Sequence, residues 1–460
     1  MSAAVSEIVA RQRSFFAGAS TRALSGRIAA LKALRRLLVS EEAAFLDALK
    51  QDLGKPPAES WLGEIGFVLG EIDRALKSLP SWTRPERART PLLLLPARSR
   101  VVPEPKGVVL IVGPWNYPLQ LLLAPLVGAL AAGNCAVLKP SELAAATSRA
   151  LSSAVGRHFD PRLVAVVEGG AETVSALLEE SFDHVFFTGS ARVGRIVMAS
   201  AAKTLAPVTL EMGGKNPAIV DRDVDLAVAS RRIAWAKFFN AGQTCVAPDY
   251  LLVPPARKPG LIEGLREAIG EFYGEDPRLS PDYARIVSDA HFSRLASLLR
   301  EGRIVVGGAT DRSARYIAPT VVEGVAADGR IMAEEIFGPI LPVLECDSLE
   351  ESIAFVNARP RPLALYYFSR DRGRQERVVR ETSSGGVCLN DAIVHILNPD
   401  LPFGGGGASG MGSYHGKASF EAFTHRKSVM ARSLRWDFRR RYPPYRTPLA
   451  VLKRLSRRLS

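Results

Sequence analysis

The 460-residue sequence is poor in the residues on which disulfide-rich and zinc-binding proteins depend. Its four cysteines, Cys135, Cys245, Cys346 and Cys388, are scattered and form no CxxC pair, which argues against a disulfide framework or a structural zinc site. Its six histidines include no HExxH or HxH arrangement, so no metal site is suggested. We therefore expect no metal cofactor and a reducing, cytoplasmic environment.

Long apolar runs are also missing. No stretch of about 18 uncharged apolar residues occurs, and the most hydrophobic one, 119–137, is interrupted by Pro125 and two glycines. Near the N-terminus, Glu7, Arg11 and Arg13 interrupt any apolar core of a secretory signal. The sequence therefore predicts neither a membrane-spanning helix nor a secretory signal.

Positive charge is in excess but unevenly placed. The net charge is +13, and residues 431–460 carry ten Arg or Lys and one acid, so the body is nearly balanced and is not of a nucleic-acid-binding type. In the tail, Leu452, Leu455 and Leu459 recur at helical spacing between basic residues. Residues 449–460 thus predict either a basic amphipathic helix that contacts an anionic membrane or a solvated tail.

The remaining composition is that of a globular protein of two or three domains, with 47% hydrophobic and 23% charged residues. Apolar residues at helical spacing predict helices over most of residues 1–80, with a break at 54–57 and a second helix from about Glu59 to Leu79. Several prolines then indicate an irregular connector, with Leu92–Leu95 a predicted short strand.

From residue 100 the pattern alternates between strands and helices, which predicts a doubly wound α/β domain of the dinucleotide-binding type. The predicted strands of this block are Val108–Val112, Cys135–Leu138, Leu163–Val167 and His184–Phe187. A second α/β block is predicted to begin near Thr209. Its predicted strands are Ala218–Val220, Leu251–Val253, Ile304–Val306, Leu341–Leu344, Ala364–Phe368 and Gly386–Leu389.

One thiol, Cys245, lies on a short polar turn between a helix-like run and a strand. Gly242 permits positive φ or a close backbone approach, and Pro248 restricts the chain just past the thiol. A thiol on such a turn can face a cavity and act as a nucleophile. The alternative is a small buried hydrophobe, which is the common fate of a free cysteine.

Two further side chains suit catalysis. Asn116 follows the strand 108–112, and its amide can hold a developing oxyanion without bringing a titratable proton; alternatively it is an ordinary turn asparagine. Glu211 lies among apolar residues and glycines, where burial raises a carboxyl pKa and makes it useful as a base. The alternative for Glu211 is a structural turn in which it accepts backbone N–H bonds.

Two motifs after strands suit a dinucleotide. Lys139 and Glu142 follow the strand 135–138 and can grip ribose hydroxyls, or else belong to a helix cap with Ser141. Phe187–Gly194 joins a strand to a helix as phosphate-binding turns do, although its glycines are spaced GxxxxG.

A third stretch pairs an acid with an aromatic ring. Glu335 and Phe337 lie two residues apart, a spacing that places both on one face of an extended segment. They can hold a ribose and flank a planar ring, or form an ordinary loop.

Taken together, these motifs resemble the aldehyde dehydrogenase superfamily over about residues 5–445. The motifs, in the superfamily's order, are Pro-Trp-Asn-Tyr-Pro (114–118), Lys-Pro-Ser-Glu (139–142), Phe-Thr-Gly-Ser (187–190), Leu-Glu-Met-Gly-Gly-Lys-Asn-Pro (210–217), Gly-Gln-Thr-Cys (242–245), Glu-Glu-Ile-Phe-Gly-Pro (334–339) and Leu-Pro-Phe-Gly-Gly (401–405). The short N-terminus and the stretches 245–250, 387–391, 409–419 and 441–445 resemble its class 3 branch, which includes fatty, aromatic and coniferyl aldehyde dehydrogenases.

The resemblance implies a role for each matching residue. Cys245 is then the nucleophile, Glu211 the general base, and Asn116 with the Cys245 backbone N–H the oxyanion hole. The implied cofactor contacts are Trp115, Lys139, Glu142, Gly189, Ser190, Gly194, Glu335 and Phe337. Tyr117 and Trp235 are our predictions for an apolar substrate channel, because both are aromatic and near catalytic residues in sequence; plain core packing is the alternative.

The implied protein is an NAD(P)-dependent aldehyde dehydrogenase, a homodimer of two doubly wound domains and a bridging element. Residues 1–82 and 103–210 are then the cofactor domain, 211–395 the catalytic domain, 83–102 and 396–430 the bridging segments, and 431–460 the tail. A carboxylate at Glu142 favours NAD, although NADP is possible. The expected substrate is a medium-chain aliphatic or aromatic aldehyde, and a CoA-dependent acylating relative and a non-catalytic scaffold are the alternatives.

Overall fold

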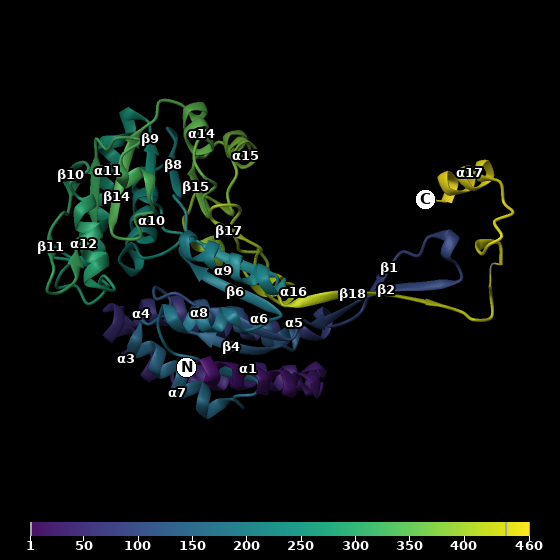
Figure 1. The fold of residues 1–460 in the computed structure, drawn as a ribbon. Helices are drawn as coiled ribbons and strands as arrows, with labels where there is room; N and C mark the ends of the chain where they lie inside the picture. Colours follow the sequence, from purple (N-terminus) through teal and green to yellow (C-terminus); the bar gives the residue numbers. More distant parts are fainter. Residues whose placement is uncertain (1, 438, 460) are drawn as a thin grey trace.

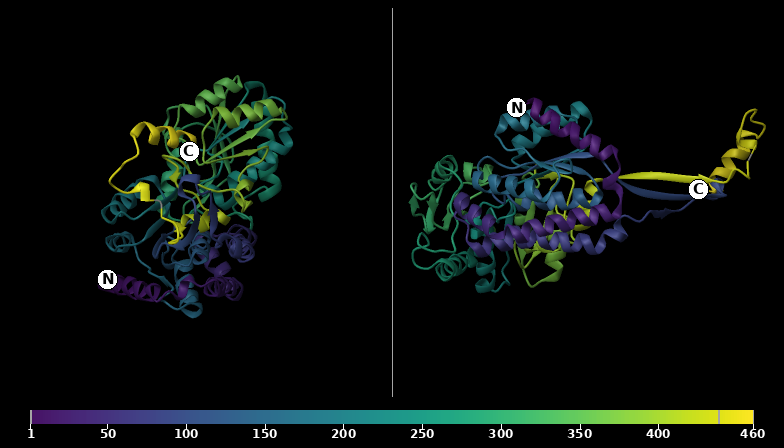
Figure 2. Two further views of the ribbon diagram at one scale, coloured as in Figure 1. Left: turned by 90° about the vertical axis from the view of Figure 1, so that its right-hand side faces the viewer. Right: turned by 90° about the horizontal axis from the view of Figure 1, so that it is seen from below.

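The computed structural model describes residues 2–437 and 439–459, and its elements form two α/β bodies and an extended ribbon of strands (Figure 1). The first body contains the N-terminal helices and one sheet. The second body contains another sheet and the helices packed on it. The ribbon leaves the first body and runs away from both (Figures 1 and 2).

The sheet of the first body has the strand order β17-β7-β6-β3-β4-β5, parallel except at β17. Its strands are β3 (Val108–Val112), β4 (Cys135–Lys139), β5 (Val164–Val166), β6 (His184–Gly189), β7 (Val208–Met212) and β17 (Gly410–Met411). Residues 108–112 are all buried, as expected for a central parallel strand covered on both faces. The predicted doubly wound fold is confirmed here.

Side chains along β3 alternate between two apolar clusters, as the period of two requires. Val109 and Ile111 pack with the helices on one face, and Val108 and Leu110 pack with those on the other. The helices of the first face are α2 (Leu24–Ser40), α3 (Glu42–Leu53), α4 (Pro57–Ser60), α5 (Gly66–Trp82), α6 (Gln120–Ala132), α7 (Ala145–His158) and α16 (Gly416–Ala422). Those of the second face are α1 (Ser2–Ala17), α8 (Ala171–Glu179) and α9 (Ala191–Thr204).

The predicted break at 54–57 separates α3 from α4. Gly54 ends α3 with φ 58°, a left-handed conformation that glycine adopts without strain. The helix predicted from Glu59 begins at Pro57 and passes through a π-helical turn, Trp61–Ile65, into α5. A π turn rotates the side chains that follow it relative to a regular helix.

The sheet of the second body has the order β10-β13-β14-β9-β8-β15-β16. Its strands are β8 (Pro217–Val220), β9 (Tyr250–Val253), β10 (Arg303–Val306), β13 (Thr320–Glu323), β14 (Ile340–Glu345), β15 (Ala364–Phe368) and β16 (Gly386–Leu389). The helices are α10 (Leu226–Phe238), α11 (Lys258–Tyr273), α12 (Asp289–Leu298), α13 (Arg330–Ala333), α14 (Leu349–Asn357) and α15 (Arg372–Glu381). A short hairpin, β11 (Thr310–Asp311) with β12 (Tyr316–Ile317), lies beside them.

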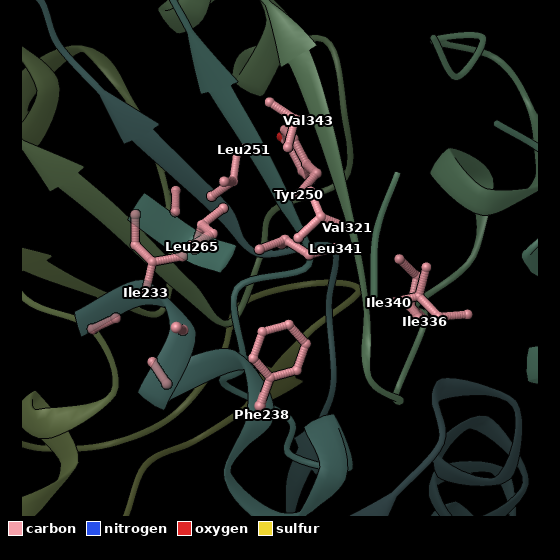
Figure 3. Close-up of a cluster of buried hydrophobic side chains, with 14 of the residues drawn as sticks. Ile233, Phe238, Tyr250, Leu251, Leu265, Val321, Ile336, Ile340, Leu341 and Val343 are labelled. Atoms are coloured by element: carbon pink, nitrogen blue, oxygen red, sulfur yellow. The ribbon is translucent and has the colours of Figure 1, made fainter. Parts of the chain in front are cut away.

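Apolar side chains from the strands and from α10 and α11 form one buried cluster, part of which Figure 3 shows around Tyr250, Leu265 and Phe238. This cluster fixes the end of α10, from which the chain enters the turn that carries Cys245.

Two sequence predictions were wrong in detail. The second block does not begin at Thr209, because β7 pairs with β6 and belongs to the first sheet; the second sheet starts with β8. Residues Leu92–Leu95 do not form a strand, because Leu92–Leu94 is a 3-10 turn after Pro91. A proline there fixes φ and favours a turn over an extended run.

The ribbon consists of β1 (Glu86–Ala88), β2 (Ala97–Pro105) and β18 (Thr424–Arg432), paired antiparallel. A helix, α17 (Leu449–Leu459), lies at its far end (Figure 1). The side chains of Leu455 and Leu459, on which the predicted apolar face of the tail depends, lie outside the described residues. In residues 2–437 and 439–459, no helix combines the length and apolar character needed to span a membrane.

Candidate active site

The turn that carries Cys245 has an unusual backbone. Asn240, Ala241 and Gly242 all have positive φ, at 53°, 51° and 73°, a conformation that non-glycine residues adopt only where the surroundings hold them. A Cβ at residue 242 would lie 2.3 Å from the carbonyl oxygen of Gly338, so only glycine fits. The Asn216 amide donates to the Cys245 carbonyl over 2.7 Å and fixes the thiol's main chain.

Two cavities meet at Cys245. The first has a volume of about 820 Å³ and the second about 860 Å³. Both are lined by Leu121, Cys245, Phe403 and Tyr414. The thiol is therefore open to both cavities and is not sealed in an apolar core, which favours the nucleophile over the buried-hydrophobe interpretation.

The first cavity gathers most of the predicted catalytic and cofactor residues. Its other lining residues are Pro114, Trp115, Asn116, Thr188, Gly189, Ser190, Glu211, Met212, Gly213, His291, Arg294, Glu335, Phe337 and Leu363. They come from the carboxyl ends of β3, β6 and β7, and from α12 and two loops of the second body. In open α/β sheets this edge is where ligands bind.

Glu211 lies on β7 and not on a turn. Both of its carboxyl oxygens are buried and have no hydrogen-bond partner among the described residues. Burial raises the pKa of Glu211 well above its ordinary value, because a low-dielectric environment disfavours the carboxylate. A carboxylate in this environment is a stronger base than one in water.

The Cys245 thiol is held in its neutral form. Burial raises its pKa, and the charges of Glu335 and Glu211 raise it further. Since the thiolate is the nucleophile, the thiol must lose its proton to a nearby base when it reacts.

Asn116 lies just past the carboxyl end of β3 and is 2% exposed. Its amide nitrogen donates to the Gln243 carbonyl over 3.0 Å, which ties it to the Cys245 turn. An amide nitrogen has two hydrogens, so one remains for a ligand in the first cavity.

Glu335 is partly buried and lines the first cavity. Its Oε1 has no hydrogen-bond partner among the described residues, and burial raises its pKa to about 8. A Cβ at Gly213 would lie 2.0 Å from Glu335 Oε2, so glycine makes room for this carboxyl group. The Phe337 ring meets the Trp115 ring edge-on, with centroids 5.3 Å apart.

Gly189 and Ser190 join β6 to α9, and the Ser190 hydroxyl accepts from the Val193 N–H at the start of the helix. Gly194 is buried inside α9, where a Cβ would lie 2.6 Å from the Met212 sulfur. This glycine lets α9 pack closely on the sheet and does not line the cavity.

Lys139 and Glu142 do not line the first cavity. Lys139 is buried at the end of β4, where its ammonium donates to the Pro140 carbonyl over 2.5 Å. Its Nζ is 3.6 Å from a carboxyl oxygen of Glu142, whose side chain is 53% exposed. The pair therefore lies farther along the same sheet edge than the residues around Cys245.

Aromatic and aliphatic side chains form the walls of the second cavity. Tyr117 and Trp235 both line it; the Tyr117 hydroxyl is 2.7 Å from Thr244 Oγ1, and the Trp235 ring meets Phe239 edge-on. Trp235 is 36% exposed. It is therefore part of a wall that reaches the surface and not of the closed core.

Two residues that line the first cavity from α12, His291 and Arg294, were not predicted from the sequence. His291 lies against Trp115, with ring centroids 4.9 Å apart, and Arg294 donates to the Ile336 carbonyl over 2.6 Å. One signal was available, since Ser288 begins this helix as an N-cap. No spacing in the sequence, however, indicates that α12 faces the first cavity.

The comparisons with known proteins agree with this geometry. Residues 1–429 match the aldehyde dehydrogenase family. The chain is 48% identical to 4,4'-diaponeurosporen-aldehyde dehydrogenase of Staphylococcus aureus, over 96% of each chain. It is 47% identical to the dimeric NADP-preferring aldehyde dehydrogenase of Rattus norvegicus, over 96% of this chain and 98% of that one.

A solved structure extends the agreement to three dimensions. The substrate-bound state of Staphylococcus aureus AldH superposes with a TM-score of 0.96 at 47% identity, covering 98% of this chain and 99% of that one. The resemblance to the class 3 branch is confirmed as well, because further relatives carry the name aldehyde dehydrogenase family 3. The chain belongs to the aldehyde dehydrogenase family and is an NAD(P)-dependent oxidoreductase.

Proposed function

We propose that this enzyme oxidises an aldehyde to a carboxylic acid through a thiohemiacetal and a thioester on Cys245, and that Glu211 assists the hydrolysis. The observation that carries this proposal is the position of Cys245, where a cavity lined by Asn116, Glu211 and Glu335 meets a second, apolar cavity. A nucleophile at such a junction can reach a substrate from one side and a cofactor from the other.

The residues of the first cavity fit NAD(P). The unpartnered buried oxygen of Glu335 can accept from a ribose hydroxyl, and Trp115 with Phe337 offers apolar faces for a planar ring. The N-terminus of α9 opens at Gly189 and Ser190, where its N–H groups suit a pyrophosphate.

The remaining cofactor assignments extend outward along the sheet edge. We assign Lys139 and Glu142 to the adenosine ribose. Gly194 serves the pyrophosphate path only indirectly, by letting α9 pack closely against Met212. A carboxylate at residue 142 accepts from a 2′-hydroxyl and repels a 2′-phosphate, which supports a preference for NAD, although NADP is also accepted.

Acylation begins with proton loss from the thiol. Glu211 is the proposed acceptor of this proton, since its raised pKa favours proton uptake near neutral pH. The sulfur then attacks the aldehyde carbon, and the resulting oxyanion is held by the Asn116 amide and the Cys245 backbone N–H. When bound, NAD(P) supplies the acceptor for the hydride that leaves this carbon.

Deacylation depends on water. Glu211 first releases the thiol's proton to solvent and so becomes a carboxylate again. A water molecule then gives a proton to Glu211 as it attacks the thioester on Cys245, and Glu211 passes this proton to the departing sulfur, which releases the carboxylic acid and restores the thiol. A base at this position favours acid release over transfer of the acyl group to CoA. Its absence would leave the enzyme stalled in the acylated form.

The second cavity supports an apolar substrate. Tyr117 and Trp235 are the proposed channel walls, and the aromatic and aliphatic lining of this cavity favours a medium-chain aliphatic or aromatic aldehyde. The Staphylococcus aureus relative is named for a polyene aldehyde, which is consistent with an apolar substrate.

We further propose a homodimer, as the Rattus norvegicus relative is named dimeric. We also propose a cofactor domain, a catalytic domain and a bridging ribbon of β1, β2 and β18. Because β7, β17 and α16 pack in the first body, the cofactor domain is extended to Met212 and takes in β17 and α16. The proposed location is cytoplasmic, with peripheral membrane contact through residues 449–460.

The experiment on catalysis follows NADH absorbance with hexanal, benzaldehyde and coniferaldehyde, with and without CoA. The Cys245→Ser variant is expected to lose turnover by at least about 10³-fold, because a serine hydroxyl is far less acidic than a thiol. Turnover should not require CoA in the unmodified enzyme. Full activity in Cys245→Ser would contradict the mechanism, and strict CoA dependence would contradict acid release.

The membrane contact is tested with vesicles. The full chain should sediment with anionic vesicles at low salt, and a chain ending at Tyr445 should not, because each basic residue near such a surface contributes about 1 kcal/mol. Binding should weaken as salt increases. Equal sedimentation of both chains would remove the role of the tail.

A further inference from the structure

An ion pair between Lys55 and Glu64 is buried beside the active site. Both side chains are fully buried, and Lys55 Nζ is 2.5 Å from Glu64 Oε1. Neither residue lines either cavity, so neither contacts the substrate or the cofactor. Since burying two charges often contributes little net stability, the contacts of this pair indicate what it does.

The ammonium group of Lys55 holds the main chain of Asn116. It donates to the Asn116 carbonyl over 3.0 Å and lies 4.2 Å from the centre of the Tyr117 ring. With Glu64 these contacts surround the ammonium on three sides. The cation therefore sits directly behind the residue whose amide faces the first cavity.

The carboxylate of Glu64 holds the next part of the same segment. Its Oε2 accepts from the backbone N–H groups of Leu119 and Gln120 over 2.8 and 3.3 Å. These groups begin α6, whose N-cap makes no side-chain capping bond of its own, so Glu64 supplies the missing acceptor. Glu64 lies in the π-helical turn 61–65.

The Asn116 carbonyl also connects to the Cys245 turn. It accepts from the Asn240 amide over 2.9 Å, while the Asn240 backbone N–H donates to Glu59 Oε2 over 2.9 Å. The N-terminal segment 55–64 thus anchors both the loop that presents Asn116 and the turn that presents Cys245.

We propose that Lys55, held in place by Glu64, is a positioning residue that fixes the Asn116 amide against the oxyanion formed at Cys245. This inference rests on the proposed oxyanion role of Asn116. A methionine at residue 55 fills a similar volume but removes the donor, and it leaves the Glu64 carboxylate buried without its cation. The loop at 116–120 then shifts, and a misplacement of about 1 Å at a reacting centre lowers a rate by about 10²-fold.

The test is a double-mutant cycle on the pre-steady-state burst of NADH. Asn116→Ala alone should slow the burst by about 10²–10³-fold, and Lys55→Met alone by about 10–100-fold. Alanine at 116 keeps the backbone carbonyl to which Lys55 donates. If Lys55 acts only by placing the Asn116 amide, it has nothing left to place in the Asn116→Ala variant. Adding Lys55→Met to that variant should then change the burst rate by less than about threefold, because coupled groups are non-additive.

Two further variants control for loss of structure. Lys258→Met removes a lysine from an ion pair with Glu323 in the second body, away from both cavities, and should leave the burst rate unchanged. Glu64→Gln removes the anion of the buried pair without removing Lys55. If Lys55→Met does not yield folded protein, Glu64→Gln is measured in the same cycle and should show the same coupling to Asn116.

The outcomes separate the two proposals. If Asn116→Ala leaves the burst unchanged, the oxyanion role itself fails. A second outcome is that Asn116→Ala slows the burst, while the Lys55 or Glu64 substitution slows it by the same factor in the presence and in the absence of the Asn116 amide. This outcome keeps the oxyanion role of Asn116 and overturns only the positioning role of Lys55. An unchanged burst in folded Lys55→Met also overturns it.

Discussion

The two cavities that meet at Cys245 are similar in volume, at about 820 and 860 Å³, but their walls differ in charge. The first contains the ionisable groups of Glu211, Glu335 and Arg294. The described lining of the second contains no side chain that is charged at neutral pH, because burial lowers the pKa of its one imidazole, His415, to about 3.

This difference in charge suggests different tasks for the two cavities, with catalysis in the first and substrate selection in the second. In the proposed mechanism, charge develops and protons move in the first cavity, where fixed polar groups lie in a low-dielectric setting and act strongly. The second cavity can contribute mainly by apolar contact, which discriminates among substrates by size and shape with smaller free energies. Substitutions in the first cavity should therefore change rates by orders of magnitude, and those in the second should change preference.

The largest effect is expected from Glu211→Gln. Steady-state turnover should fall by about 10²–10⁴-fold. The first turnover should be slower, because the thiol also loses its base, but it should still release about one NADH per active site, because the hydride leaves before hydrolysis. In the unmodified enzyme deacylation should rise with pH as Glu211 ionises, since burial raises its pKa, and this pH dependence should vanish in the variant. Stopped-flow absorbance measures both phases.

The control for Glu211→Gln is the same substitution at a buried glutamate outside both cavities. Glu323→Gln changes a buried acid on β13, which pairs with Lys258 and lines neither cavity, so its turnover should match the unmodified enzyme. If Glu211→Gln behaves like Glu323→Gln, the first cavity does not supply the base.

A smaller effect is expected from Trp235→Ala in the second cavity. The kcat/KM for hexanal and benzaldehyde should fall by about 3–10-fold, with little change for acetaldehyde, because only the longer substrates reach this wall. The matched control is Trp436→Ala, an exposed tryptophan outside both cavities. A uniform loss for all three aldehydes would remove Trp235 from the substrate channel.

The sequence predicted the sheets well because buried parallel strands are apolar throughout. The strands expected at Val108–Val112 and Ala364–Phe368, whose residues are all buried, occur at those residues. The ribbon strands β2 and β18 were not predicted, since β18 is largely exposed and its partner lies more than 300 residues away in sequence. Pairing at such separation leaves no local pattern.

The site was predictable only where a residue lies in a distinctive motif. Cys245, Asn116 and Glu211 line one cavity, as their motifs led us to expect. Lys55 and Glu64 gave no signal, because a lysine and a glutamate nine residues apart resemble any solvated helix face. Their proposed positioning role follows from burial and from contacts with residues 116–120, which only the three-dimensional structure supplies.

The most direct test of the account is the intact mass of Glu211→Gln after reaction with hexanal and NAD. We predict one acyl group per chain, on the peptide that contains Cys245, with the adduct lost on treatment with hydroxylamine as a thioester should be. An unmodified Cys245 in protein that has released its burst of NADH, or an acyl group on another residue, would contradict it.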